Sequence, residues 1–363
     1  MAKTSFSAPK AAHLLEWYRK HGRDLPWRSH HGRAPSPYHT WLSEIMLQQT
    51  GVITVIPYYE RFTTKWPRVQ DLANAHEDEI LKEWAGLGYY SRARNLLKCA
   101  RQIVAEYDSI FPDNVIELKK LPGIGEYTSN AIRAIAYDKP ANVVDGNVER
   151  VVSRVFAFDE PINLPQNKAK LKELAASLSP QTDNSDYAQA IMDLGATICT
   201  PRNPKCLICP WNKNCLAFQN NLTDKIPQVQ KKAKIPERHT NIFVMHDAQN
   251  RFLLRQRPSQ GLLGGLWEFP STEWQKMDET IDQDAILSTI DTSDFMELPK
   301  PVIHVFTHFR LTMTVFILRR PIDLANVKNL GQFFDVNNLP ALPTLMVKVL
   351  EAAQNSFKLK AQL

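Results

Sequence analysis

The first half of the chain follows a helical pattern of apolar positions. Apolar residues recur at spacings of three and four, as Leu42, Ile45 and Met46 do among polar neighbours. This is the period of an amphipathic α-helix. We therefore expect helices over residues 8–21, 38–50, 148–157, 168–178 and 187–197, and further helices between 53 and 107, where no long strand pattern occurs.

Beyond residue 238 the apolar residues gather in short runs with turn residues between them. Ile242 to Met245, Phe252 to Leu254 and Pro301 to Arg319 are rich in β-branched and aromatic residues, which is typical of strands. A last helical pattern, Thr344 to Ala353, is expected to pack on the resulting sheet. This half is therefore predicted to be α+β.

A polar, Lys-rich segment separates the two patterns. It runs from Asn220 to Arg238 and contains Pro227 and Pro236, a composition typical of an interdomain linker. We predict a multidomain chain with an all-α domain over 8–220, a linker over 221–237 and an α+β domain over 238–355. A chain of 363 residues is long enough to bury two separate cores.

The charge balance is mildly basic. Lys and Arg number 44 against 38 Asp and Glu, so the formal net charge is +6. This excess permits a polyanionic partner without requiring one. The N-terminus lacks the apolar region of a signal peptide, and the apolar segments are short or interrupted by charges. We therefore expect a cytoplasmic monomer without a membrane span.

The stretch from Leu121 to Arg150 combines a tight loop with two predicted helix starts. Pro122 ends any preceding helix, while Gly123 and Gly125 let the backbone turn sharply and approach a ligand closely. Backbone N–H groups at the start of the next helix, near Tyr127, would then face an anion such as a phosphate. A Pro-Gly-X-Gly sequence is often only a turn, so the loop alone fits either interpretation.

Two carboxylic acids near predicted helices are candidates for chemistry. Glu44 lies on a helix with an apolar face, where partial burial would raise its pKa. Asp145 is a good N-cap residue, as is Asn147, and a carboxylate at a helix start stays ionised. The plain alternatives are a solvated pair of Glu44 with Gln48 and two ordinary helix caps.

A second glycine-rich turn, Gly86–Ser91, can expose a bulky apolar side chain at its tip. Arg92 and Arg94 follow it and are placed to reach phosphates. A protein that extrudes a base fills the gap with such a wedge. An ordinary helix–helix turn with a buried Tyr is the alternative. Cys99 has no ligand type beside it in sequence and is expected to be a core residue.

The other four cysteines form a compact set: Cys199, Cys206, Cys209 and Cys215. Short, uneven spacings suit either a tetrahedral zinc ion or a cubane iron–sulfur cluster, and four sulfurs alone do not decide between them. Disulfides are the weaker alternative because cytosolic thiols stay reduced.

Together these motifs resemble the helix-hairpin-helix DNA glycosylase superfamily that includes endonuclease III, and within it the adenine-specific MutY family. WLSEIMLQQT (Trp41–Thr50) resembles the segment that carries the catalytic Glu of that family, and GLGYYSR resembles its intercalating turn. The loop LPGIG followed by Asp145 resembles the Gly/Pro...Asp signature. The cysteine spacing coincides with the one that holds a [4Fe-4S] cluster in this group. The resemblance covers about Lys10 to Ala353.

The resemblance implies a base-excision-repair enzyme. It would flip an adenine mispaired with 8-oxoguanine or guanine out of double-stranded DNA and hydrolyse its N-glycosidic bond, leaving an abasic site. Glu44 would protonate adenine, Asp145 would stabilise the sugar cation or a transient covalent adduct, and Tyr127 with Asn147 would orient them. Contacts to the base or the DNA are implied for Arg28, Gln49, Thr50, Leu87, Gly88, Tyr89, Leu121, Gly123 and Gly125. In a prokaryote such a protein would associate with the nucleoid.

The residue at position 127 distinguishes members of this superfamily that catalyse different reactions. The bifunctional members carry a Lys there, which attacks the sugar to form a Schiff base. Tyr127 occupies this place here. Because a phenol cannot form an imine, we expect a monofunctional glycosylase without efficient strand cleavage.

The second domain resembles the Nudix-like C-terminal domain of the same glycosylases, including GLLGGLWEFP at Gly261 to Pro270. The following segment, STEWQKMDETIDQD, lacks the Arg-Glu and paired glutamates that hold Mg²⁺ in a catalytic Nudix box, so binding rather than hydrolysis is expected. A Phe-Ser-His turn reads the oxidised guanine in the family, and Phe306, Thr307 and His308 correspond to it here. The Thr keeps the hydroxyl and adds a methyl group. Strand packing is the plain alternative for Phe306 and His308.

Two other functions stay open at this stage. One is an endonuclease III-like pyrimidine glycosylase and lyase, which Tyr127 and the second domain disfavour. The other is a non-catalytic iron–sulfur protein that binds DNA or senses redox state, with Glu44 and Asp145 as plain surface and cap residues.

Overall fold

The computed structural model describes residues 7–28, 35–230, 234–258, 260–276, 294–322, 327 and 330–360. Contacts divide the chain into two compact units. The first comprises Met1–Ala75 and Arg94–Lys232, and the second comprises His76–Ala93 and Ala233–Leu363. The domain boundaries that we expect from the sequence stay a prediction.

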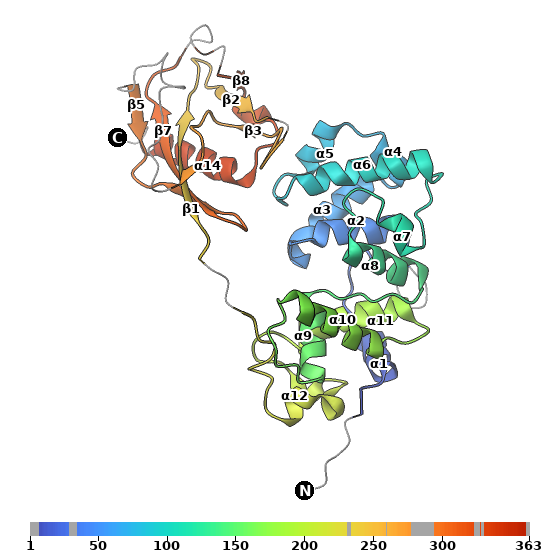
Figure 1. The fold of residues 1–363 in the computed structure, drawn as a ribbon. Coiled ribbons are helices and arrows are strands. Elements are labelled where there is room, and N and C mark those ends of the chain that lie inside the picture. The colour runs from blue at the N-terminus through green and yellow to red at the C-terminus, as the bar shows by residue number, and fades with distance from the viewer. Residues whose placement is uncertain are drawn as a thin grey trace. The chain divides into compact units, whose positions relative to one another are not determined.

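The first unit is built from helices (Figure 1). In chain order they are α1 (Ala11–His21), α2 (Pro37–Leu47), α3 (Val52–Lys65), α4 (Val69–Ala73), α7 (Val115–Leu118), α8 (Glu126–Tyr137), α9 (Gly146–Val155), α10 (Pro165–Leu178), α11 (Asn184–Asp193), a π-helix η1 (Leu194–Ile198), two 3₁₀ turns η2 (Cys206–Ile208) and η3 (Asn212–Asn214), and α12 (Leu216–Gln219). Helix α6 (Ser91–Glu106) begins in the second unit and continues in the first.

These helices form two groups. Helix α1 packs on α11 and shares an apolar core with α9 and α10, in which Leu14, Val152 and Leu171 are fully buried. Helix α2 packs on α8 and α3. The chain therefore returns after α8 to cover its own N-terminal helix, which brings residues far apart in sequence to one place.

Most predicted helices are present, but their boundaries differ from those predicted, as α10 (Pro165–Leu178) and α14 (Thr344–Lys360) show. Helix α2 ends at Leu47 rather than Thr50 because Gln49 adopts a positive φ of 57°, which an α-helix does not accommodate. Helix α8 begins at Glu126, one residue before the expected Tyr127. The helix expected over 187–197 becomes a π-helix at Leu194, where the Cys199 N–H donates to the Leu194 carbonyl at 2.7 Å.

The second unit holds α5 (Glu77–Trp84) and a mixed sheet. Its strands are β1 (Glu237–Val244), β2 (Phe252–Gln256), β3 (Trp267–Glu268), β4 (Gln275–Lys276), β5 (Phe295–Glu297), β6 (Val302–Val305), β7 (Arg310–Leu318) and β8 (Gln332–Phe334). One sheet has the order β4-β1-β7-β5, with β6 also paired to β7; β1 and β7 are parallel and the other pairs are antiparallel. A smaller sheet has the order β3-β2-β8.

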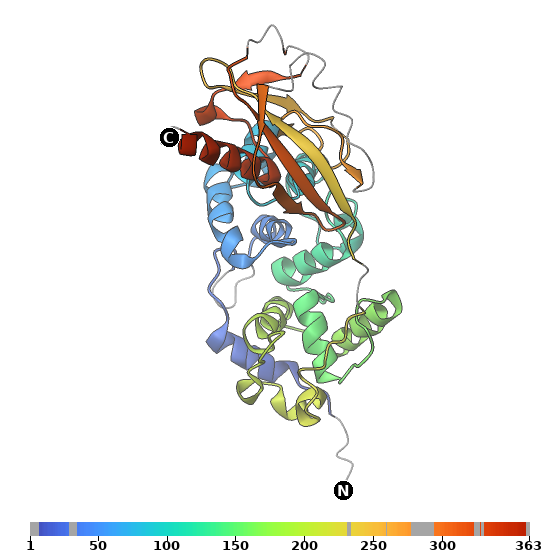
Figure 2. The same ribbon diagram turned by 90° about the vertical axis from the view of Figure 1, so that its left-hand side faces the viewer.

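Helix α14 (Thr344–Lys360) crosses one face of the larger sheet (Figure 2). Leu345, Met346 and Val349 on this helix pack against buried residues of β1 and β7 such as Ile242 and Val315. An all-α part followed by an α+β part is therefore confirmed as the fold class. Of the segment STEWQKMDETIDQD, the residues after 276 lie outside the described part. Among the described residues, no helix is long and apolar enough to cross a membrane.

Candidate active site

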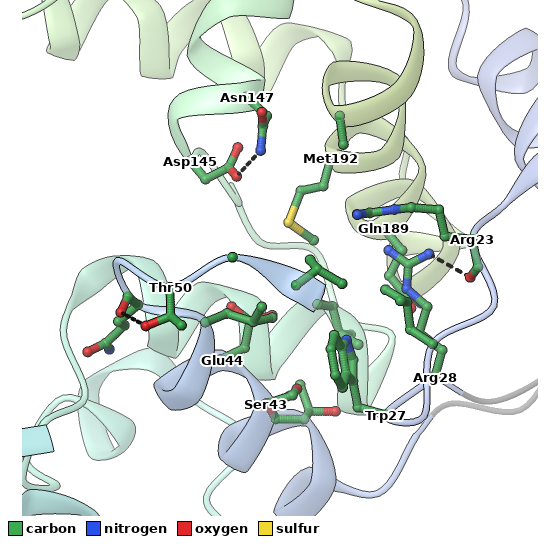
Figure 3. A pocket seen from close by; sticks show the side chains of 18 of the residues that line it. Arg23, Trp27, Arg28, Ser43, Glu44, Thr50, Asp145, Asn147, Gln189 and Met192 are labelled. Atoms are coloured by element: carbon green, nitrogen blue, oxygen red, sulfur yellow. Dashed lines mark hydrogen bonds between the residues drawn. The ribbon is translucent and has the colours of Figure 1, made fainter. Parts of the chain in front are cut away.

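A cavity of about 440 Å³ lies in the first unit (Figure 3). Residues from α2, α8, α9, α11 and the segment before α2 line it. The predicted site residues that meet in this cavity are Arg28, Glu44, Gln49, Thr50, Tyr127, Asp145 and Asn147. The segments that carry these residues are separated in sequence, so the fold assembles the site from several helices.

Glu44 is enclosed by protein although its side chain ends in a carboxyl group. It projects from α2 and is 6% exposed. Burial raises the pKa of this carboxyl to about 7, and the charge of Asp145 acts in the same direction. A hydrogen bond from Tyr127 and the charge of Arg28 oppose the shift. Glu44 is therefore placed to hold a proton near neutral pH.

Tyr127 stands on the first turn of α8 and is close enough to Glu44 and Asp145 to be affected by both charges. Burial, followed by the charges of Glu44 and Asp145, raises the pKa of its phenol well above the ordinary value. The hydroxyl also lies 3.5 Å from the Met192 sulfur. Tyr127 is therefore a neutral hydrogen-bond donor in this site.

Asp145 is the N-cap of α9, as the sequence suggested. Its carboxylate accepts hydrogen bonds from the Val148 N–H at 2.8 Å and from the Asn147 side-chain amide at 2.9 Å. These two donors fix the orientation of the carboxylate toward the cavity. In Figure 3, Asp145 and Asn147 face Glu44 across the open space.

Asn147 is itself held by contacts with the chain before the cysteine loop. Arg150 donates to the Asn147 side-chain oxygen at 2.9 Å, to the Gly195 carbonyl at 2.7 Å and to the Cys199 carbonyl at 2.8 Å. A Cβ built on Gly195 would lie 2.7 Å from the Asn147 Cβ. Asn147 therefore has little freedom to move, and neither does the carboxylate that it supports.

The other side of the cavity is framed by two arginines around one carboxylate. Arg28 donates to both Asp193 oxygens at 2.7 and 2.8 Å, and Arg23 donates to Asp193 from its backbone N–H and its Nε. Burial alone would raise the pKa of Asp193, but the hydrogen bonds and charges of these arginines lower it. This bidentate, buried arrangement fixes both guanidinium groups.

Sequence reasoning missed several residues that line the cavity: Arg23, Trp27, Thr40, Ser43, Gln189 and Met192. Arg23 and Trp27 shortly precede the predicted Arg28 in the chain, and that proximity was a usable signal. Gln189 and Met192 lie three residues apart on α11, which is an ordinary amphipathic spacing without a motif. Only the packing of α11 reveals that this face borders the site.

The glycine-rich loop before α8 has the geometry expected of a close approach. Gly123 has φ +78°, and a Cβ there would lie 3.0 Å from Asn95. Gly125 is the N-cap of α8, has no side-chain cap, and a Cβ there would meet nothing within 4 Å among the described residues. Leu121 is 2% exposed and anchors the loop. The space beside Gly125, at the start of α8, is therefore open.

In the second unit, the turn Gly86–Ser91 exposes one of its bulky side chains. Leu87 is buried, at 5% exposed, whereas Tyr89 is 46% exposed and has φ 50° beside Gly88 at φ 71°. Arg92 does not extend outward to a phosphate, as the sequence suggested. It is 8% exposed and donates to the carbonyls of Leu87 and Gly88, so it braces the turn.

Thr307 and His308 form the exposed tip of the β6–β7 turn, while Phe306 stacks on Phe309 at 4.7 Å. Phe306, which follows the last residue of β6, is therefore packed against an aromatic neighbour in the DNA-free protein. The Thr307 and Tyr89 hydroxyl oxygens lie 2.8 Å apart and share a hydrogen bond.

The four loop cysteines lie near one another: burial first, and then the negative charge of neighbouring thiolates, raises the pKa of the Cys209 and Cys215 thiols. Arg154, 2% exposed, donates to the Cys199 sulfur at 3.4 Å and to the carbonyls of Thr200 and Ile226. Among the described residues, no three His, Cys, Asp or Glu side chains are arranged to hold a single metal ion. The four thiols of the loop are a donor set that an iron–sulfur cluster accepts.

Three family models match the chain. Residues 42–180 match the HhH-GPD superfamily of base excision DNA repair proteins, residues 199–215 match the iron–sulfur binding domain of endonuclease III, and residues 241–352 match the NUDIX domain. The predicted iron–sulfur cofactor of the cysteine loop is therefore confirmed, as are the helix-hairpin-helix and Nudix-like identities of the two parts.

Individual relatives agree with these models. The adenine DNA glycosylase of Buchnera aphidicola (strain Sg) is 34% identical over 344 residues, which are 93% of this chain and 96% of the relative. The adenine DNA glycosylase of Arabidopsis thaliana is 35% identical over 84% of this chain, which spans 56% of that relative. A solved thermostable thymine-DNA glycosylase is 33% identical with a TM-score of 0.52, over 58% of this chain and 95% of that one.

Proposed function

Because the chain belongs to the family of adenine DNA glycosylases, we propose that it removes adenine mispaired with 8-oxoguanine or guanine and leaves an abasic site in duplex DNA. The observation that carries this proposal is the convergence of Glu44, Tyr127 and Asp145 on one cavity. A cavity of about 440 Å³ is in the range of small-molecule sites and has room for one flipped purine.

Glu44 acts as the general acid. Expulsion of adenine leaves negative charge on the base unless a ring nitrogen is protonated. A carboxyl group with a pKa of about 7 is partly protonated at neutral pH and can deliver that proton. Tyr127 donates a hydrogen bond to Glu44 and orients it.

Asp145 supports the sugar. As the glycosidic bond breaks, the deoxyribose becomes oxocarbenium-like, and a carboxylate beside it stabilises the positive charge or forms a transient covalent adduct. The hydrogen bonds from Val148 and Asn147 hold this carboxylate in place before the reaction begins. The proton from Glu44 leaves with the base; water then bonds to the sugar carbon through its oxygen and gives one proton to the Glu44 carboxylate, which restores the acid.

The DNA backbone meets the loop before α8. Open space over Gly125 and the uncapped N–H groups of α8 suit a phosphate. Leu121 and Gly123 give this loop its shape, and Gln49 with Thr50 border the mouth of the cavity. The iron–sulfur cluster, held by its four cysteines, fixes the loop that carries them and takes no part in bond breaking.

Tyr89 and Thr307 meet the nucleotide opposite the target adenine. Tyr89 is the exposed large side chain on its turn, and a stacked ring can fill the gap that a flipped base leaves. The shared hydrogen bond with Thr307 joins the wedge to the turn at 306–308, so His308 and Thr307 lie beside it. Without paired glutamates to hold Mg²⁺, the Nudix-like part recognises the lesion and does not hydrolyse a pyrophosphate.

Release of thymine from a mismatch is the second candidate, favoured by the likeness of the helical part to a thymine-DNA glycosylase. Single-turnover base release should be measured on duplexes with adenine opposite 8-oxoguanine, guanine or thymine, and with thymine opposite guanine. We expect release from the first two. Release of thymine alone would exclude the adenine proposal, and no release from any duplex would leave a non-catalytic DNA-binding protein.

A further inference from the structure

Thr40 is a buried side chain in the cavity whose hydroxyl is unsatisfied. The residue is 2% exposed, and its Oγ1 has no hydrogen-bond partner in the part of the chain that the structure describes. Of the buried side-chain atoms left without a partner there, this one alone belongs to a residue lining the 440 Å³ cavity. Buried hydroxyl groups are normally hydrogen-bonded, because leaving one unpaired is costly. A ligand in the cavity can supply the partner.

The position of Thr40 on α2 relates it directly to the general acid. Thr40, Ser43, Glu44 and Leu47 are the α2 residues that line the cavity, and their spacing places them on one stripe of the helix. Thr40 stands one turn before Glu44, so their Cβ atoms are separated by roughly 6 Å. The Ser43 hydroxyl donates to the Thr40 carbonyl at 2.9 Å. Of the two hydroxyl groups on this stripe, the Ser43 hydroxyl has a hydrogen-bond partner, whereas the Thr40 hydroxyl has none in the described part of the chain.

The proposed roles of Asp145 and Glu44 determine how the flipped nucleoside is oriented in the cavity. The sugar lies beside Asp145, and Glu44 meets the base. Figure 3 shows Asp145 and Trp27 on different sides of Glu44, with Thr50 at the end of α2 that lies away from Trp27. With the sugar at Asp145 and Glu44 beside the base, the part of the base farthest from the sugar can extend along α2 to Thr40, which is buried and lines the same cavity.

The chemistry of adenine matches this order. N7 is an acceptor and the 6-amino group is a donor, and both lie on the same edge of the base. N7 belongs to the ring attached to the sugar, whereas the 6-amino group projects from the distal ring. If Glu44 donates to N7, the neighbouring 6-amino group comes next along the stripe of α2. A threonine hydroxyl can accept a hydrogen bond from it.

We propose that the Thr40 hydroxyl binds the exocyclic group at C6 of the flipped purine and so acts as a specificity-determining residue. This inference rests on the proposed adenine release. The hydroxyl accepts from a 6-amino group and is equally able to donate to a 6-oxo group. Thr40 therefore requires a polar substituent at C6, and the exclusion of guanine falls to other residues.

The test combines two conservative variants with two bases. Single-turnover release is measured for the full-length, cluster-loaded protein, for Thr40→Val and for Thr40→Ser, on duplexes carrying adenine or unsubstituted purine opposite 8-oxoguanine. Thr40→Val should slow adenine release roughly three- to tenfold, the effect of one neutral hydrogen bond. It should leave purine release within about twofold, because purine has no group for the hydroxyl to bind. Thr40→Ser should stay close to the parent on both bases.

Stability provides an independent readout. Because the hydroxyl lacks a partner in the DNA-free protein, Thr40→Val should melt at the same temperature as the parent or higher. Equal slowing of adenine and purine release by Thr40→Val would overturn the inference, as would a lower melting temperature that Thr40→Ser restores. Absence of adenine release by the parent protein would instead refute the proposed function itself, so the two failures are distinguishable.

Discussion

Gly195 lies so close to Asn147 that a Cβ on Gly195 would come within 2.7 Å of the Asn147 Cβ. Gly195→Ala should therefore displace Asn147 and with it the Asp145 carboxylate that Asn147 supports. We expect base release to fall by about 100-fold, the usual scale for misplacing a catalytic group by about 1 Å. Single-turnover kinetics measure this, and the visible absorption of the cluster checks that the neighbouring loop is intact.

The same substitution in an Asn147→Gly background serves as its control. Asn147→Gly slows the reaction by itself, but it removes the Cβ with which the new methyl group collides. Gly195→Ala should then add little further loss. If the two effects simply multiply, the collision is not the cause.

Glu44 sets the pH dependence of base release. The protonated carboxyl is the active form, and its pKa is raised to about 7 by burial. The rate constant should therefore be level well below pH 7 and fall about tenfold per pH unit well above it. A pH profile under single-turnover conditions measures this. Glu44→Gln should abolish the descending limb along with most of the activity, and a rate that rises through pH 7 would contradict the acid role.

Asp145 should matter for the reaction far more than for binding. Asp145→Asn keeps the size of the side chain and an oxygen able to cap α9, but it removes the negative charge beside the sugar. We expect base release to be lost while the affinity for mismatched duplex stays within a few-fold. Binding by fluorescence anisotropy and release on the same duplex measure the two effects. Equal losses in both would assign Asp145 to structure or DNA contact.

Gly123 and Gly125 form a matched pair with opposite consequences. Gly123→Ala strains a backbone at φ +78° and crowds Asn95, so it should lower the melting temperature. Gly125→Ala adds a methyl group in open space, so it should leave the melting temperature unchanged and weaken DNA binding by obstructing the phosphate. Thermal melts and duplex titrations compare the two. Normal DNA binding by Gly125→Ala would remove the loop from the proposed interface.

Because position 127 is a Tyr rather than a Lys, we expect that the protein does not cut the DNA strand. A phenol cannot condense with the sugar aldehyde to an imine. Borohydride added during turnover should therefore trap little covalent protein–DNA complex, and abasic product should appear without breakage until alkali is added. Denaturing gels with and without alkali distinguish the two products. Trapping in high yield would reveal another amine as the nucleophile.

The sequence was most informative where a motif lies on a continuous stretch. Glu44, Tyr127 and Asp145 each sit in a short run whose turn and cap residues can be read locally, and the structure brings them to one cavity. The end of α2 was misplaced because the positive φ of Gln49 depends on its tertiary surroundings, since Gln has no intrinsic preference for it. Arg92 was misassigned for a related reason: charge suggests exposure, but here two backbone carbonyls take the guanidinium.

Elsewhere, prediction from the sequence was limited by contacts between residues that lie far apart in the chain. Arg28 was expected in the site, but its partner Asp193 is 165 residues away on a helix that carries no motif. Gln189, on the same helix, lines the cavity because α11 packs against α1 and α8. One sequence shows which helix faces are apolar, yet it does not show which neighbour each face will meet.

The π-helix at Leu194–Ile198 determines the direction in which Cys199, the first cysteine of the loop, projects. The Cys199 N–H reaches back five residues to Leu194 instead of four, so the chain holds one supernumerary residue at this turn. Shortening it by one would restore ordinary winding and rotate everything downstream by about 100° about the helix axis. Cys199 would then point away from its three companions, so a single-residue deletion here is equivalent to losing a ligand without mutating a cysteine.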